Sequence, residues 1–188
     1  MKIPQNASKV FTGNVFDVYQ WEQDMYDGTK ATFEALKRPA TIQIIPTLKD
    51  KLYLSHEEQP SKPLCYTFLG GRQEKGDELE ETAKRELLEE TGFRSNDWEL
   101  IKTYEADGKI EWITYLFVAR NVEKVAKPKL DGGEKIEVVE VGWDKFLEIV
   151  TSEDFWGKDI SNDIFRISKD SKKLDEFRQK ILGNFTSE

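Results

Sequence analysis

One stretch, residues 70–93 (GGRQEKGDELEETAKRELLEETGF), constrains what this chain can fold into more than any other. It is typical of a short glycine turn followed by one amphipathic helix. Asp77 and Glu80 have the spacing of a capping box, so we expect Asp77 to be the N-cap residue and the helix to begin at Glu78. Gly92 is placed where a left-handed residue commonly ends a helix, so we expect the helix to end just before it.

The inward face of this helix combines apolar and acidic side chains. On a helical wheel, Leu79, Ala83 and Leu87 form the apolar stripe that must pack on the core. Glu86 and Glu90 fall on the same face, although carboxylates are disfavoured near a helix C-terminus and costly to bury unpaired. The missing positive charge is most simply a bound divalent cation.

The basic residues of the same helix do not supply that charge. Lys84 points away from the inward face, and Arg85 lies on its flank, where it is better placed to pair with Glu81 and Glu89. Ligands that are all oxygen favour Mg²⁺ or Mn²⁺ over zinc, which prefers cysteine and histidine. A solvated acidic helix is the alternative interpretation. It explains the outward glutamates well and the inward pair poorly, so we favour the metal.

The spacing of nine residues in this stretch resembles the Nudix box, G-x5-E-x7-R-E-U-x-E-E-x-G-U, where U is apolar. The matching residues are Gly71, Asp77, Arg85, Glu86, Leu87, Glu89, Glu90, Gly92 and Phe93. Asp77 is the single departure, because the family has a glutamate there. Matches at this many fixed positions are far more specific than a lone glycine motif.

The Nudix resemblance implies hydrolysis of a nucleoside diphosphate linked to another group, with Mg²⁺ or Mn²⁺ as cofactor. By this resemblance Glu86 and Glu90 are the primary metal ligands, and the carbonyl of Gly70 is an additional ligand. Glu89 is either a ligand or the base that activates water. Arg85 holds a box glutamate in place.

Residues 9–38 predict an antiparallel β unit ahead of the box. VFDVYQW and ATFEALK alternate apolar and polar side chains, and Asp27-Gly28 supplies the turn between them. A sheet this small cannot bury enough apolar surface alone, so it must pack on the main domain or on a second subunit. We expect residues 1–38 to form an N-terminal β extension and residues 39–188 to form the Nudix domain with its C-terminal helices.

This extension is similar to that of the ADP-ribose pyrophosphatase branch, whose members typically form homodimers in which the N-terminal segment helps to build the nucleotide pocket. The resemblance makes Trp21, Phe33 and Phe16 candidates for stacking on a base. For any single aromatic, packing inside the extension or the dimer is the better interpretation. Arg38 is a candidate for a bidentate phosphate contact, with a surface salt bridge as the alternative. Arg72 is a further substrate-binding candidate.

The rest of the chain predicts a mixed sheet between two layers of helices. Strands are predicted for ATIQIIP, KLYLSHE, CYTFL, WELIKTYEA, EWITYLFVAR and KIEVVEVGW. Helices are predicted for DKFLEIV, SNDIFRISKD and SKKLDEFRQKIL, the last with Leu174, Phe177 and Ile181 facing inward. We expect an α/β fold, the α/β/α sandwich of Nudix type, with the C-terminal helices on one face of the sheet and the box helix on the other.

An acidic loop, KPKLDGGE, precedes the last predicted strand. Such a loop is usually no more than a solvated turn. Its position nevertheless resembles the mobile loop that carries a further catalytic glutamate in ADP-ribose pyrophosphatases. Glu134 is the matching residue, and Asp131 is the fallback.

Composition narrows the partners and the compartment. The net charge is −8 and no run of Lys or Arg stands out, which argues against a nucleic acid partner. No apolar run approaches membrane-spanning length, and the N-terminus lacks the apolar core of a signal peptide. The single cysteine, Cys65, lies in an apolar run and fits a buried position in a reducing compartment. We therefore expect a cytoplasmic protein.

The expected substrate is a small nucleotide, with ADP-ribose as first choice and other nucleotide sugars close behind. The ADP-ribose branch usually has a proline in a turn shortly after the box, and residues 105–109 (EADGK) have none. The first choice therefore depends on the N-terminal β unit. A nucleoside triphosphate pyrophosphatase is the enzymatic alternative. A non-catalytic regulatory protein that binds ADP-ribose is the alternative from another class.

Overall fold

A computed structural model of the chain describes residues 2–60 and 62–183. The elements in chain order are β1 (Ser8–Thr12), β2 (Asp17–Asp24), β3 (Lys30–Lys37), β4 (Thr41–Leu48), β5 (Lys51–Gln59), β6 (Lys62–Thr67), α1 (Leu79–Thr91), β7 (Phe93–Arg94), β8 (Asp97–Glu105), β9 (Ile110–Glu111), β10 (Ile113–Arg120), β11 (Glu123–Lys124), β12 (Lys135–Val141), α2 (Trp143–Val150), α3 (Lys158–Ile167) and α4 (Ser171–Leu182). Every strand and helix expected in residues 39–182 is present.

The main sheet is mixed and has the strand order β12-β5-β4-β10-β8, with β6 paired to β5. Strand β10 runs parallel to β4, and the other pairs are antiparallel. β4 and β5 pair only beside their turn, through Thr47 with Leu52 and Leu48 with Lys51. The rest of that edge of β4 is left for the glycine segment that leads into α1.

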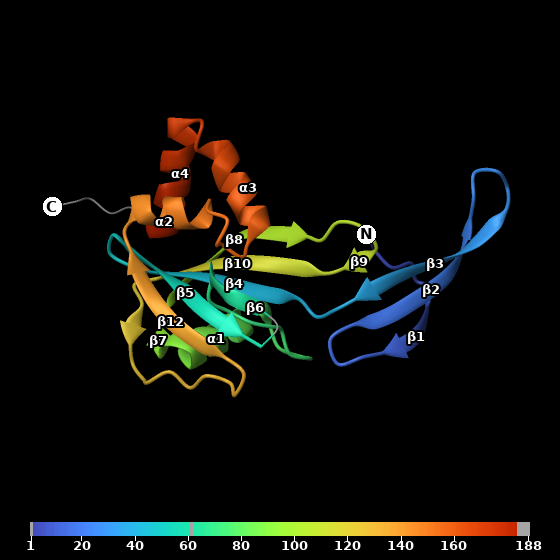
Figure 1. The fold of residues 1–188 in the computed structure, drawn as a ribbon, viewed down its shortest axis with the longest axis horizontal. Helices are drawn as coiled ribbons and strands as arrows, with labels where there is room; N and C mark the ends of the chain where they lie inside the picture. Colours follow the sequence, from blue (N-terminus) through green and yellow to red (C-terminus); the bar gives the residue numbers. More distant parts are fainter. Residues whose placement is uncertain (1, 61, 184–188) are drawn as a thin grey trace.

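Helices cover both faces of this sheet, which confirms the expected α/β/α sandwich (Figure 1). Helix α1 packs on one face through Ala83 and Leu87, together with Ile42, Ile44 and Phe117 of the sheet. The other face, under α2–α4, holds the larger core cluster. As predicted, α4 turns Leu174, Phe177 and Ile181 toward that core. In the described residues no helix is long and apolar enough to cross a membrane.

The start of α1 differs from the sequence prediction. The helix begins at Leu79 with Glu78 as N-cap residue, and no side chain caps it. Asp77 does not form the expected capping box, because it lies in the preceding turn, where its N–H bonds to the Glu74 carbonyl and its own carbonyl accepts from Gln73. The predicted end is confirmed: Gly92 is left-handed, with a φ of 69°.

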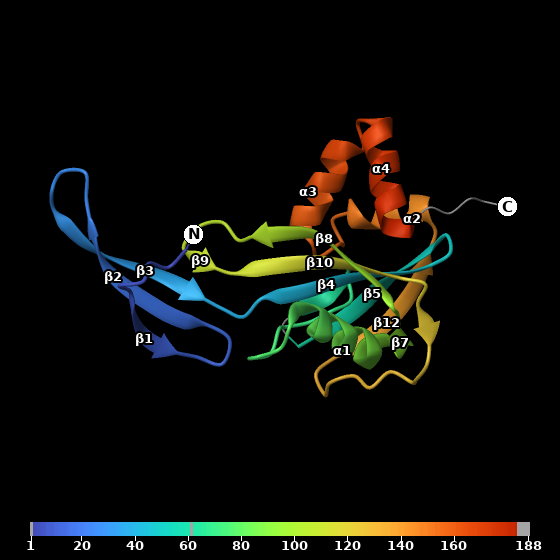
Figure 2. The same cartoon turned by 180° about the vertical axis from the view of Figure 1, so that it is seen from behind.

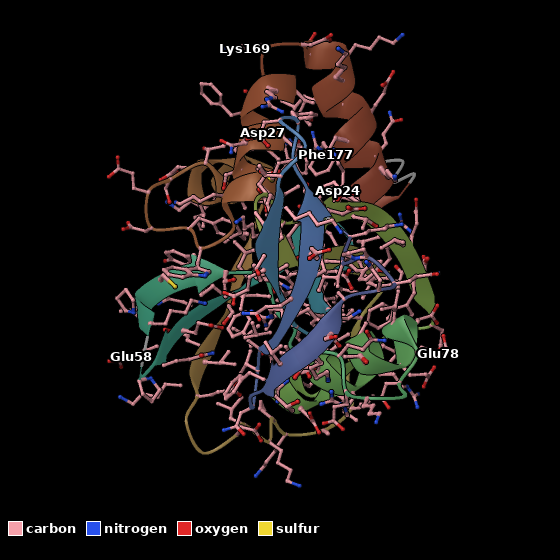
Figure 3. The ribbon with its side chains drawn as sticks, turned by 90° about the vertical axis from the view of Figure 1, so that its right-hand side faces the viewer. Asp24, Asp27, Glu58, Glu78, Lys169 and Phe177 are labelled. Atoms are coloured by element: carbon pink, nitrogen blue, oxygen red, sulfur yellow. The ribbon has the colours of Figure 1, made fainter. Side chains whose placement is uncertain are left out.

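The N-terminal residues form a separate sheet that extends away from the sandwich (Figures 1 and 2). Its order is β1-β2-β3-β9, and a turn at Asp27 and Gly28 joins β2 to β3, as predicted. The view in Figure 3 looks onto this sheet, with Asp24 and Asp27 at the tip of the hairpin. Strand β9, not anticipated from the sequence, attaches the sheet to the main body by running parallel to β3.

Candidate active site

The glycine segment before α1 is held along β4 by backbone hydrogen bonds. The N–H groups of Ile42 and Ile44 donate to the carbonyls of Gly71 and Leu69, each at 2.8 Å. Gly70 has a φ of +126°, and a Cβ there would lie 2.2 Å from the Ile42 carbonyl oxygen. Only glycine fits this position, because it tolerates both the positive φ and the close approach to β4.

The segment and α1 together enclose two carboxylates. Glu90 is only 5% exposed, and its Oε2 accepts a 2.7 Å hydrogen bond from the Gly70 N–H. The Glu86 side chain is 15% exposed and lies against Gly71, where a Cβ would come within 2.5 Å of the carboxylate. The predicted inward orientation of both glutamates is therefore confirmed, and Gly71 leaves room for one of them.

Burial shifts the ionisation of these groups. Desolvation raises the pKa of Glu90 well above its ordinary value, against the effect of the Gly70 hydrogen bond. Desolvation also raises the pKa of Glu86, although the neighbouring Arg85 guanidinium opposes the shift. Both carboxylates repel each other and Glu134 as well. A cation placed among them would relieve the cost of keeping them ionised.

The expectation that no basic residue of the helix supplies charge to the inward glutamates is wrong for Glu86, because Arg85 pairs with it. Arg85 contacts Glu86 at 2.8 Å and Glu89 at 2.9 Å, and it approaches Glu74 at 3.9 Å. The expected pairing with Glu89 is confirmed, whereas the suggested pairing with Glu81 is wrong. Glu81 pairs instead with Lys84, three residues along the exposed face of the helix.

A cavity of about 300 Å³ lies in front of the box glutamates. Glu134, from the loop between β11 and β12, lines its opposite side together with Asp131. Desolvation raises the pKa of Glu134, and Asp131 and Glu89 contribute repulsion. The loop is anchored to the end of α1 by Lys129, whose N–H donates to the Glu89 carbonyl at 2.7 Å. The structure thus brings the loop glutamate and the box glutamates to one cavity.

The donor set of this cavity suits a hard divalent cation. Glu86, Glu89, Glu90 and Glu134 all present carboxylate oxygens, which Mg²⁺ and Mn²⁺ prefer. Within residues 2–60 and 62–183, however, no group of three or more acidic, His or Cys side chains is already arranged to hold a metal ion. Arg85 occupies a position in contact with both Glu86 and Glu89. The residue chemistry fits a metal, and binding it requires these side chains to rearrange.

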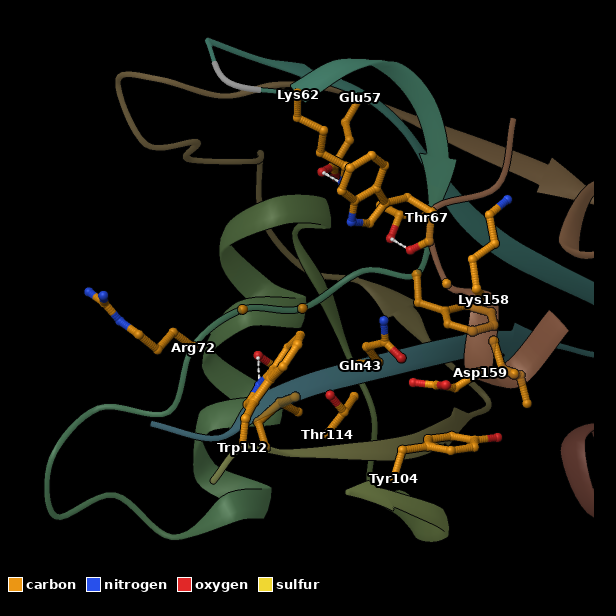
Figure 4. A pocket seen from close by; sticks show the side chains of 18 of the residues that line it. Gln43, Glu57, Lys62, Thr67, Arg72, Tyr104, Trp112, Thr114, Lys158 and Asp159 are labelled. Carbon is orange, nitrogen blue, oxygen red and sulfur yellow. Dashed lines mark hydrogen bonds and ion pairs between the residues drawn. The ribbon is translucent and has the colours of Figure 1, made fainter. Parts of the chain in front are cut away.

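A larger cavity of about 530 Å³ adjoins the acidic one (Figure 4). Arg38, Gly71 and Arg72 line both cavities and so mark the seam between them. Arg38 is half-buried at this seam. The Arg72 side chain is exposed and extends outward toward the Asn14 carbonyl, 3.5 Å away.

The aromatic residues of the N-terminal segment that are candidates for base stacking lie in a different part of the structure from the box glutamates. Trp21 and Phe33 face each other across β2 and β3, with ring centroids 6.0 Å apart. Neither lines the two cavities described above. Phe16 lies nearer, since the Arg38 guanidinium is 5.6 Å from its ring. Base stacking by Trp21 or Phe33 stays a prediction that would require a second subunit.

Several walls of the larger cavity were not anticipated as site residues. They are Thr41, Gln43, Glu57, Lys62, Tyr104, Trp112, Trp156 and Asp159. One of them carries a signal in the sequence, because Gln43 is a polar residue between two isoleucines of β4. The others come from separate segments that only the fold brings together.

Comparison with known proteins bears on this arrangement. The family model of the NUDIX domain matches residues 37–163 of the chain, which include α1, the Glu134 loop and the walls of the larger cavity. An ADP-ribose pyrophosphatase of Bacillus subtilis (strain 168) is 31% identical over 153 residues, which cover 79% of this chain and 82% of that protein. The chain belongs to the NUDIX family. It is a Nudix pyrophosphohydrolase.

The chain is also similar to a second curated protein and to a solved structure. A methanol dehydrogenase activator of Bacillus methanolicus is 28% identical over 150 residues, covering 77% of this chain and 80% of that protein. A crystal structure of an ADP compounds hydrolase superposes with a TM-score of 0.70 at 20% identity, covering 90% of this chain and 95% of that one. The structural match confirms the Nudix fold predicted from the sequence.

Proposed function

We propose that this Nudix enzyme hydrolyses the diphosphate bond of ADP-ribose or a related nucleotide sugar, in a reaction that depends on Mg²⁺ or Mn²⁺. The observation that carries the proposal is the seam between the two cavities. Carboxylates of the box helix line the acidic cavity on one side of it, and the guanidinium of Arg38, which has no carboxylate partner among the described residues, lies at the seam itself. A diphosphate with a substituent at each end matches such a seam, since its charged centre needs cations and its ends need space.

The residues of the seam have distinct parts in binding. Arg38 contacts a phosphate, and Arg72 joins it by turning its exposed side chain inward. One substituent of the diphosphate fits the 530 Å³ cavity, where Trp156 offers an aromatic face and Gln43 offers hydrogen bonds. The other substituent projects past the acidic cavity.

Glu86 and Glu90 are the proposed primary metal ligands, with Glu89 and the Gly70 carbonyl as further ligands. A divalent cation held there supplies charge neutralisation of the diphosphate and activation of water. Arg85 then keeps a box glutamate in position. The buried and mutually repelling carboxylates support this assignment, because ionised groups in such a place need a cation.

The hydrolysis adds one water molecule across the P–O–P linkage. The water oxygen bonds to one phosphorus, the bond between that phosphorus and the bridging oxygen breaks, and the bridging oxygen leaves on the other phosphate. ADP-ribose gives AMP and ribose 5-phosphate in this way. Glu134 is the proposed base that takes the water proton, with Glu89 as the alternative. Its raised pKa makes the Glu134 carboxylate a stronger base than an ordinary one.

Support for ADP-ribose comes from the similarity to the Bacillus subtilis ADP-ribose pyrophosphatase and from the N-terminal β sheet. That sheet also supports the homodimer expected from the sequence. A cytoplasmic location remains a prediction that rests on composition alone.

The test is a substrate panel of ADP-ribose, several nucleotide sugars and nucleoside triphosphates, assayed for monophosphate release with Mg²⁺ and with EDTA. We expect ADP-ribose or a nucleotide sugar to be cleaved fastest, and only with metal. Preferred cleavage of triphosphates would favour the triphosphate pyrophosphatase. Tight binding of ADP-ribose without cleavage would overturn the proposal in favour of a regulatory protein.

A further inference from the structure

Arg38 is held in an unusual place for a charged side chain. Its guanidinium carbon lies 4.4 Å from the centre of the Trp112 ring and 5.6 Å from that of Phe16. Its Nε is buried without a hydrogen-bond partner, and no carboxylate pairs with it among the residues that the structure describes. Burial, together with the nearby Arg72, lowers its pKa. A half-buried cation without an acidic partner is prepared for an anion that the chain does not supply.

Two neighbouring side chains fix the direction in which this guanidinium points. The Oγ1 of Thr41 accepts a hydrogen bond from the Trp112 Nε1–H at 3.0 Å (Figure 4), and it also accepts from Arg38 at 3.4 Å. Thr41 is therefore hydrogen-bonded both to the Arg38 guanidinium and to the Trp112 indole that covers it. Trp112 lies between β9 and β10, so the contact joins parts of the chain 71 residues apart.

We propose that Trp112, fixed by Thr41, is a positioning residue. It holds Arg38 at the seam in the orientation in which the guanidinium binds the diphosphate. The inference rests on the proposed function, and it assigns a part to a residue outside the Nudix box. Stacking and the shared hydroxyl acceptor restrict the guanidinium before substrate arrives. Less rotational freedom is then lost when the phosphate binds, which is how preorganisation raises affinity.

Three substitutions separate the elements of this arrangement. Trp112→Leu removes the aromatic face, Trp112→Phe keeps a face but removes the Nε1–H, and Thr41→Val removes only the hydroxyl. Trp98→Leu is the matched control, because Trp98 is another half-buried indole with one backbone acceptor, and it lines neither cavity. Arg38→Ala and the double variant Arg38→Ala/Trp112→Leu complete a thermodynamic cycle.

The measurements are the Kd for ADP by calorimetry in EDTA, KM and kcat for ADP-ribose with Mg²⁺, and Tm. We expect Trp112→Leu to weaken ADP binding and to raise KM about tenfold, the effect of a lost charged hydrogen bond, with a smaller change in kcat. Trp112→Phe should recover most of that loss, and Thr41→Val should lose about threefold. Trp98→Leu should change neither constant.

The decisive result is the cycle. In the Arg38→Ala background, Trp112→Leu should have no further effect on ADP binding, because the group that it positions is gone. An unchanged Kd in Trp112→Leu, or additive losses in the double variant, would overturn the inference, and additivity would assign Trp112 a direct contact with the ligand. Because this cycle uses ADP without metal, it is independent of turnover. If the cycle shows the expected coupling in ADP binding but the wild type hydrolyses no compound of the panel, only the proposed function is refuted.

Discussion

At the scale of single residues, the site depends on glycine, which leaves space for neighbouring groups, as much as on its functional side chains. Gly71 has no positive φ to explain it, and its role follows from the Glu86 carboxylate that occupies the space of a Cβ. Substituting this residue therefore moves a carboxylate without straining the backbone of the turn.

We predict that Gly71→Ala lowers kcat about 100-fold, because a displacement of about 1 Å in an aligned group can cost that much. The free energy of unfolding should change by less than about 1 kcal/mol, since the carboxylate can swing away. Steady-state kinetics and urea denaturation measure the two effects. Gly142→Ala is the control, as its Cβ would meet nothing within 4 Å. A Gly71→Ala enzyme with normal turnover would show that the Glu86 position is not critical.

The buried glutamates also predict a dependence of stability on pH. Folding raises the pKa of Glu90 and Glu86 above 4.5. In the pH window from 4.5 up to the raised pKa values, the folded chain therefore binds more protons than the unfolded chain. The metal-free protein should lose stability as the pH rises through the raised values, because the ionised carboxylates are then buried. Below that window both states are protonated, and the penalty disappears.

Glu90→Gln should remove the largest part of this effect. In EDTA, the variant should be more stable than the wild type at a pH of about 8 and close to it near pH 4.5, as measured by urea denaturation. The amide can still accept the Gly70 hydrogen bond, so the comparison isolates the charge. Added Mg²⁺ should stabilise the wild type and leave the variant nearly unchanged. A variant less stable than the wild type at both pH values would contradict the account.

At the scale of elements, we expect the junction between α1 and the Glu134 loop to couple packing to catalysis. Gly92 has a positive φ, and a Cβ there would lie 2.1 Å from the Ala126 carbonyl oxygen. The Gly92 carbonyl in turn accepts hydrogen bonds from Val125 and Ala126 at the start of the loop. The end of the helix therefore sets the path of the loop that carries Glu134.

Comparing two glycines tests this coupling. Gly28→Ala and Gly92→Ala both force alanine into the left-handed region, at roughly 1–2 kcal/mol, yet a Cβ at Gly28 would meet nothing within 4 Å. We predict that Gly28→Ala costs only that amount and keeps full activity. Gly92→Ala should cost at least about 1 kcal/mol more and lower kcat about tenfold, because the loop must move. Chemical denaturation and kinetics check both, and equal losses in the two variants would refute the coupling.

The elements also show how far sequence reasoning reached. The inward glutamates and the left-handed Gly92 were predictable, since both follow from the periodicity of one helix. The N-cap of α1 was not predictable, because hydrogen bonds with Gln73 and Glu74 hold Asp77 in a turn. No local sequence pattern indicates that turn. Strand β9 and the Arg38–Trp112 contact were missed for the same reason: each pairs segments more than 70 residues apart.

At the scale of the whole molecule, the N-terminal sheet leaves its edge strand uncovered. All five residues of β1 are exposed, among them Val10 and Phe11, at 51% and 60%. An exposed apolar edge strand is a ready surface for pairing with another chain. This geometry supports the homodimer expected from the sequence, and the dimer is also what could bring Trp21 and Phe33 near a substrate.

We therefore predict that sedimentation gives a mass about twice that of the 21.9 kDa chain. The double variant Val10→Lys/Phe11→Lys should shift the protein to the monomer, because two charges at the paired edge repel their counterparts. Phe165→Lys, which changes an equally exposed side chain on α3, should leave the dimer intact. A wild-type chain that sediments as a monomer at micromolar concentration would contradict the prediction.

The fold of the sandwich was predictable because the Nudix box predicted one helix and alternating patterns predicted the strands before and after it in the sequence. The larger cavity was not, because its walls come from separate segments, among them β4, β5, β10 and the start of α3, and Gln43 alone stands out within its strand. Sequence therefore located the acidic cavity, whereas the fold was needed to locate the larger cavity beside it.

The central claim is that the buried box carboxylates drive hydrolysis of a diphosphate bond. The most direct measurement is AMP release from ADP-ribose with Mg²⁺, followed by chromatography for the wild type and for Glu90→Gln. We predict rapid release by the wild type, none above background in EDTA, and a rate at least about 100-fold lower for the variant. Equal rates for the two proteins would contradict the account, because the most deeply buried carboxylate of the site would then have no part in the reaction.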